Sequence, residues 1–147
     1  MGWTSKIIIV LLVILLFSIT VFSNITKEVE SPSDWVKEEQ IEVFNDKIIL
    51  NIQDAIWAKF TNTNSMDPFI DETSNAIEII PQNADDINPG DVISYKTSYG
   101  TLIHRVIEKD QDEEGIYYLV KGDNNTIRDP FKVRFDDVKG VVVAVVY

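Results

Sequence analysis

The sequence predicts a mainly β protein: a small antiparallel β-barrel or sandwich domain that follows one N-terminal transmembrane helix. Three observations support this prediction. A long apolar run opens the chain, short β-prone stretches fill most of the remainder, and turn-forming residues separate those stretches at short intervals. Many short strands with frequent turns are typical of barrels and sandwiches. The length of 147 residues leaves room for one compact domain.

The N-terminal segment, residues 1–24, is expected to be a membrane anchor. Residues 7–22 read IIIVLLVILLFSITVF, in which only Ser18 and Thr20 are polar. A helix from residue 3 to residue 24 would reach about 30 Å, the thickness of the apolar core of a bilayer. A cleaved secretory signal is the alternative, because Lys6 followed by an apolar core fits that pattern too. We favour the anchor, since no clean small-x-small cleavage site follows the run.

The charges around this segment predict its orientation. Lys6 is the only basic residue before the apolar run, and acidic residues follow it at positions 28, 30 and 34. Positive charge favours the cytoplasmic side of a membrane. We therefore expect a single-pass membrane protein with a cytoplasmic N-terminus, an extracytoplasmic domain and the lipid bilayer as a partner.

The composition excludes several classes of function. The chain carries 13 Lys and Arg against 24 Asp and Glu, a net charge of −11, which makes nucleic acid an unfavourable partner. It has no cysteine, so disulfides, thiolate metal sites and a cysteine nucleophile are excluded.

The segments after the anchor divide into a linker and a domain. Residues 25–40 are polar and charged and predict a linker, which leaves residues 41–147 for the β-rich domain. A hairpin is expected around Asn45 and Asp46, between strands at 41–44 and 47–52. The apolar C-terminal run is too short to span a membrane and predicts a buried strand. The further strands are expected at residues 56–60, 76–80, 91–96, 101–107, 116–121 and 138–146.

Three separate segments carry residues suited to nucleophilic catalysis. His104, the only histidine, lies in the strand-like LIHRVI segment, and Ser65 lies in a polar bend before a proline. Asp123 and Asp129 lie in the turn-rich segment after residue 121. Taken singly, these are an ordinary buried histidine and ordinary turns. Taken together, they supply a serine nucleophile, a base for its proton, and a carboxylate that orients the base.

Four short motifs resemble those of the type I signal peptidases and occur in the order found in that family. SMDP at 65–68 resembles the Ser-Met-Glu-Pro motif around the nucleophile, and GDVI at 90–93 resembles the Gly-Asp-hydrophobic strand. IHRV at 103–106 resembles the box with the general base, and GDNN at 122–125 resembles the Gly-Asp-Asn box. The resemblance covers roughly residues 57–146. It implies a membrane-bound serine endopeptidase that cleaves signal peptides from exported precursor proteins at the extracytoplasmic membrane face, without a metal or cofactor.

The resemblance also implies a role for each site residue. His104 stands where bacterial-type members carry lysine, which is similar to the endoplasmic-reticulum, archaeal and sporulating-bacterium branch. Carried over by motif, Ser65 is the nucleophile and His104 is the general base. Asp129 or Asp123 orients the imidazole, with Asp129 preferred. The backbone N–H of Ser65 and the hydroxyl of Thr63 would form the oxyanion hole.

The chain departs from the family pattern at two positions beside the nucleophile. Asn64 stands where the family usually has glycine, and Asp67 replaces the commoner glutamate or methionine. The alternative function is a membrane-tethered β-domain that binds partners through an inactive relic site. A self-cleaving relative of the repressor proteases ranks last, because those proteins use a lysine base and lack an anchor. The sequence leaves open whether accessory subunits are required.

Overall fold

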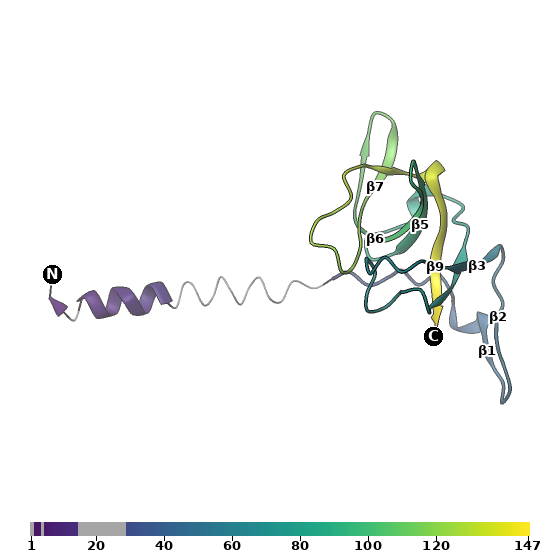
Figure 1. Ribbon diagram of the computed structural model, residues 1–147, viewed down its shortest axis with the longest axis horizontal. Helices are drawn as coiled ribbons and strands as arrows, with labels where there is room; N and C mark the ends of the chain where they lie inside the picture. Colours follow the sequence, from purple (N-terminus) through teal and green to yellow (C-terminus); the bar gives the residue numbers. More distant parts are fainter. Residues whose placement is uncertain (1, 4, 15–28) are drawn as a thin grey trace.

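The computed structural model describes residues 2–3, 5–14 and 29–147, and the part from residue 41 onward is built from two antiparallel sheets (Figure 1). Strands β1 (Ile41–Val43) and β2 (Ile48–Leu50) form a two-stranded sheet. The other strands form one seven-stranded sheet in the order β3-β4-β9-β5-β6-β7-β8. Their bounds are β3 (Ala55–Lys59), β4 (Asn75–Ile79), β5 (Val92–Thr97), β6 (Gly100–Asp112), β7 (Gly115–Lys121), β8 (Val133–Arg134) and β9 (Val138–Val146).

The mainly β prediction is confirmed, but the larger sheet is not a closed barrel. Strands β3 and β8 end the strand order, and within the described residues they do not pair with each other. All eight expected strands occur with small shifts of their ends. Two differences stand out: β8 was not predicted, and β6 continues to Asp112 through charged residues that pair with β7. Short 3-10 turns lie at Glu38–Gln40 (η1), Ala84–Asp86 (η2) and Phe135–Asp137 (η3).

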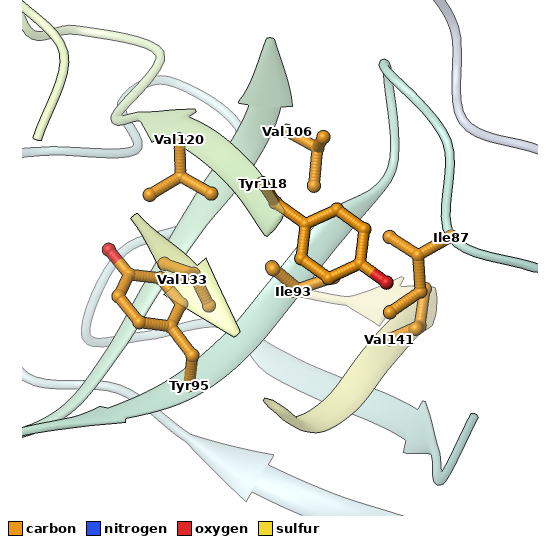
Figure 2. Packing of buried hydrophobic residues seen from close by; sticks show 8 residues of the cluster. All are labelled: Ile87, Ile93, Tyr95, Val106, Tyr118, Val120, Val133 and Val141. Carbon is orange, nitrogen blue, oxygen red and sulfur yellow. The ribbon is translucent and has the colours of Figure 1, made fainter. Parts of the chain in front are cut away.

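The main core lies on one face of the sheet and contains two tyrosines. Tyr95 of β5 and Tyr118 of β7 are fully buried among aliphatic side chains from five elements of the chain (Figure 2). The hydroxyl of Tyr118 donates to the carbonyl of Ala84 at 2.6 Å, which satisfies a polar group that burial would otherwise leave unpaired. The other members of this cluster are Ile87, Ile93, Val106, Val120, Val133 and Val141.

A second, smaller core lies on the other face of β5. Val92 precedes Ile93 on the strand, so the two side chains point to opposite faces. Val92 packs with Met66 and Ile70, which belong to the segment after β3. The segment that carries Ser65 is therefore fixed to the sheet by its own apolar side chains. Burial of apolar surface stabilises such a contact by about 25 cal/mol for each Å² removed from water.

Residues of the predicted linker pack onto the domain through Asp91, which is 0% exposed. One carboxylate oxygen accepts from the N–H of Ser33 at 2.6 Å and from the indole N–H of Trp35 at 3.1 Å. The other accepts from the hydroxyl of Ser33 at 3.2 Å and from the N–H of Asn88 at 2.8 Å. A Cβ at the preceding Gly90 would lie 2.1 Å from the carbonyl oxygen of residue 31, so only glycine permits this approach.

Asp91→Ala is expected to lower the free energy of unfolding by about 3 kcal/mol, because it leaves several donors without their charged acceptor. Urea denaturation followed by tryptophan fluorescence measures the change. Asp46→Ala, in the exposed turn between β1 and β2, is the matched control and should be neutral. Equal stability of the two variants would contradict a structural role for the Asp91 bonds.

The predicted membrane anchor is wrong for the residues that the structure describes. Helical backbone is described from residue 5 to residue 14, about 15 Å at 1.5 Å per residue. Across the described ranges, no helix combines the length and the apolar character needed to cross a membrane. This finding contradicts the expected single-pass protein with a cytoplasmic N-terminus and an extracytoplasmic domain. Residues 15–24 of the predicted anchor lie outside the described residues.

Candidate active site

The loop that carries Ser65 leaves the end of β3 and is fixed by the turn at residues 122–125. Asn64 adopts a φ of 55°, in the left-handed region that asparagine tolerates better than most residues. Asn64 thus adopts a backbone conformation that glycine also adopts readily. The side-chain amide of Asn124 donates to the carbonyl of Asn64 at 2.9 Å, and its backbone N–H donates to the carbonyl of Ser65 at 2.9 Å.

Gly122 allows this turn to approach the loop that carries Ser65 closely. A Cβ at Gly122 would lie 2.6 Å from the carbonyl oxygen of Ser65, closer than such atoms can come. The backbone N–H of Asp123 also contacts the sulfur of Met66 at 3.4 Å. Two motifs that are far apart in the sequence therefore meet through backbone groups.

His104 lies on β6 opposite Ile93 of β5 and is 6% exposed. Its Nδ1 atom is 3.0 Å from Oδ1 and 3.1 Å from Oδ2 of Asp129, which is also buried. The hydroxyl of Tyr95 lies 3.1 Å from the same nitrogen and donates to Oδ2 of Asp129 at 2.5 Å. Three buried side chains, from β5, β6 and the segment after β7, thus form one hydrogen-bonded group.

The hydrogen bonds in this group assign the tautomer of His104. Tyr95 has one hydroxyl proton, and its 2.5 Å bond directs that proton to Asp129. An ionised carboxylate only accepts, so the proton between His104 and Asp129 resides on Nδ1. A neutral imidazole then has its lone pair on Nε2. Burial, followed by the hydrogen bond and charge of Asp129, raises the pKa of Tyr95 far above its ordinary value, which keeps its hydroxyl protonated.

The two candidate aspartates occupy different places. Asp129 contacts His104, whereas Asp123 forms a bidentate ion pair with Arg105, at 2.8 Å from Nε and 2.6 Å from Nη2. Arg105 also donates from Nη1 to the carbonyl of Gly90 at 2.8 Å. His104 and Arg105 are neighbours on β6 and point to opposite faces. Asp123 therefore fixes the turn beside Ser65, and Asp129 is the carboxylate at the imidazole.

Ser65 and His104 line the same cavity, which has a volume of about 230 Å³. The hydroxyl of Ser65 lies 3.1 Å from the hydroxyl of Thr63, and among the described residues no hydrogen bond joins Ser65 to His104. The apolar part of the cavity wall comes from Ala58, Phe60, Met66, Ile70, Leu102 and Ile103.

The cavity wall also contains a buried carboxyl group, that of Glu78 on β4. Glu78 is 3% exposed, and its Oε2 atom accepts from the hydroxyl of Ser94 at 2.8 Å. Its Oε1 atom is buried and has no hydrogen-bond partner within the described chain. Burial raises the pKa of this carboxyl above its ordinary value, and the hydrogen bond from Ser94 offsets part of that shift.

The raised pKa of Glu78 predicts a pH-dependent effect of Glu78→Gln on stability. The folded protein holds this proton more tightly than the unfolded chain, so wild-type stability falls as pH rises above about 4.5, the ordinary value, and through the raised folded value. Glu78→Gln removes that loss. We expect the variant to be the more stable protein at pH 8 but not at pH 4, in urea denaturation at both pH values. Glu72→Gln, at an exposed position, should show no such divergence, and parallel pH profiles for Glu78→Gln would contradict the prediction.

Sequence reasoning missed Tyr95 and Glu78, although each carried a signal. The hairpin between β5 and β6 places Ile93 opposite His104 and Tyr95 opposite Leu102, so Tyr95 shares the face of the histidine. Glu78 is a single acidic residue within the apolar AIEII segment. Neither signal identifies the hydrogen-bond partner, which is Asp129 for Tyr95 and Ser94 for Glu78. No group of three or more His, Cys, Asp or Glu side chains that could hold a metal ion occurs in the described ranges.

Comparisons with known proteins assign no family to the chain. No protein-family model matches it, and no solved structure matches it. One segment of 44 residues is 43% identical to an uncharacterized protein of Methanocaldococcus jannaschii. That segment is 30% of this chain and 22% of the archaeal protein, so the similarity spans about a fifth of that relative.

Proposed function

We propose that the protein is a serine endopeptidase of the type I signal peptidase family and that it removes signal peptides from exported precursor proteins. The observation that carries this proposal is the buried Asp129–His104 pair, 3.0 Å apart, whose imidazole lines the same cavity as Ser65. Such a pair orients a general base beside a hydroxyl nucleophile. In this proposal the open seven-stranded sheet is the peptidase domain.

The proposed chemistry uses His104 twice. Ser65 Oγ attacks the scissile carbonyl carbon while Nε2 of His104 takes the hydroxyl proton. The imidazolium that forms is stabilised by Asp129, and its proton passes to the departing amine as the peptide bond breaks. Water then attacks the acyl-serine ester and loses a proton to Nε2. The ester bond breaks as that proton passes to Ser65 Oγ, which releases the acid and restores both Ser65 and neutral His104.

Two donors are placed to stabilise the tetrahedral oxyanion. The backbone N–H of Ser65 is one, and the hydroxyl of Thr63, 3.1 Å from Ser65 Oγ, is the other. In this proposal both groups donate to the substrate oxygen as negative charge develops on it. Removing one such donor typically reduces kcat by 10²- to 10³-fold, or about 3–4 kcal/mol.

The edge strand β3 offers a place for an extended substrate. Strand β3 ends the strand order, and residues 58–60 at its end line the cavity. An exposed strand edge presents unpaired backbone groups that an added peptide strand can bond. These features support a precursor bound as a strand beside β3.

The test is cleavage of a panel of purified precursors by the full-length protein. We expect shortened products whose new N-termini follow small residues, identified by mass spectrometry and N-terminal sequencing. The same precursors without their signal peptides are the control and should remain intact. Binding of precursors without any cleavage would contradict the proposal and favour the alternative, a β-domain with an inactive site.

A further inference from the structure

We propose that Glu78 and Ser94 form a polar floor in the cavity beside Ser65 and that this floor selects a substrate residue with a small hydroxyl side chain, serine or threonine, over alanine. The inference rests on the proposed function and deepens it. It assigns specificity to two residues that belong to none of the four motifs.

The backbone around Glu78 is shaped to hold its carboxyl group in this place. Glu78 on β4 lies beside β9, and Gly140 of β9 lies opposite Ser94 of β5. A Cβ at Gly140 would lie 2.7 Å from Oε2 of Glu78. The absence of a side chain at Gly140 therefore lets the carboxyl cross β9 and reach the Ser94 hydroxyl at 2.8 Å.

The pair leaves hydrogen-bonding capacity unused at the cavity wall. Ser94 directs its hydroxyl proton to Glu78 and keeps lone pairs that can accept. Oε1 of Glu78 has no partner among the described residues, and a buried polar atom without a partner is unfavourable. Both side chains line the cavity that Ser65 and His104 also line. A ligand that forms a hydrogen bond with Oε1 would supply the partner that this atom lacks among the described residues.

A hydroxyl suits this floor in either protonation state of Glu78. An ionised carboxylate accepts a hydrogen bond from the ligand hydroxyl, and a neutral carboxyl donates one to the ligand oxygen. The methyl group of alanine can do neither.

The test compares two pairs of peptides that span the junction between the signal peptide and the mature part of an exported precursor. The members of a pair differ only in alanine or serine at the first or the third position before that junction. Binding is measured by titration calorimetry on Ser65→Ala protein, and kcat/KM is measured on protein with Ser65 intact. We expect the serine peptide of one pair to bind about five- to tenfold more tightly than its alanine partner, the effect of about one net hydrogen bond. The same ratio should appear in kcat/KM.

The variants identify the source of the preference. Glu78→Leu and Ser94→Ala should each bring the serine-to-alanine ratio near one, whereas Glu78→Gln, which keeps the hydrogen-bonding capacity, should retain most of it. Glu72→Gln, at an exposed position before β4, is the matched control and should leave the ratio unchanged. Circular dichroism checks that each variant is folded. If Glu78→Leu does not fold, the ratios of Ser94→Ala and Glu78→Gln show whether the polar floor is the source of the preference.

The two proposals fail differently. Equal binding of both peptides, binding of neither, or a preference that survives both Glu78→Leu and Ser94→Ala overturns the polar floor, whatever the cleavage assay gives. A serine preference in binding, together with no cleavage of any peptide or precursor by protein with Ser65 intact, overturns the peptidase function and leaves the polar floor standing.

Discussion

Replacing Ser65 with alanine is expected to lower the rate of precursor cleavage by about a thousandfold or more, because the reaction then lacks its nucleophile. The chain has no cysteine that could take over the attack. Stability should change by less than about 1 kcal/mol, since the half-buried Ser65 side chain makes one hydrogen bond within the described part of the chain, to Thr63. Single-turnover cleavage of a radiolabelled precursor measures the rate, and urea denaturation measures the stability.

Two controls accompany the Ser65 variant. Ser98→Ala changes an exposed serine between β5 and β6 and should leave cleavage unchanged. Thr63→Ala removes the neighbouring hydroxyl and should reduce kcat by about 10²-fold, as expected for the loss of one oxyanion donor. Wild-type cleavage by Ser65→Ala protein would assign the nucleophile to another residue and end the proposed mechanism.

Asp129→Asn is expected to reduce kcat by about a thousandfold or more while the protein stays folded, because it reverses the tautomer of His104. The carboxylate accepts from Tyr95 at 2.5 Å, so the amide oxygen of asparagine would take that place and its NH2 group would face Nδ1. An NH2 group donates, which forces the imidazole proton onto Nε2. His104 then has no lone pair directed at Ser65.

The contrast with Asp123 makes this prediction specific. Asp123 pairs with Arg105, so Asp123→Asn should loosen the turn at residues 122–125 and lower stability more than Asp129→Asn does. Asp136→Asn, at an exposed position, serves as the neutral control. Initial rates at saturating precursor and urea denaturation separate the two effects. Full activity of Asp129→Asn protein would remove the assigned role of this residue.

The strands could be predicted from sequence because their signals are local. Turn residues and short apolar stretches placed eight strands within a few residues of their observed ends. Strand β8, residues 133–134, carries no such signal, since it exists through its pairing with Tyr117 and Tyr118 of β7. The charged half of β6 was missed for the same reason: its hydrogen bonds to β7, not its own pattern, make it a strand.

The candidate site was predictable only as a set of residue types. Alternation along β6 indicates that the side chains of His104 and Arg105 point to opposite faces of the sheet. Because each of these two side chains can pair with a carboxylate, one aspartate on each face could have been expected. Which of Asp123 and Asp129 reaches which face depends on the path of the chain after β7, and turn chemistry does not encode that path. The bond from Tyr95 depends on the same path, because its acceptor is Asp129.

The docking of Ser33 and Trp35 on Asp91 also determines how far the chain can be shortened from its N-terminus. A truncated protein that begins at residue 41 would expose one side of the core that Trp35 covers and would leave a buried carboxylate with a single donor, the N–H of Asn88. The damage would extend to the turn at residues 122–125, since Arg105 links the carbonyl of Gly90 to Asp123. A protein that begins at residue 29 retains this attachment and is the better starting point for crystallisation and inhibitor screening.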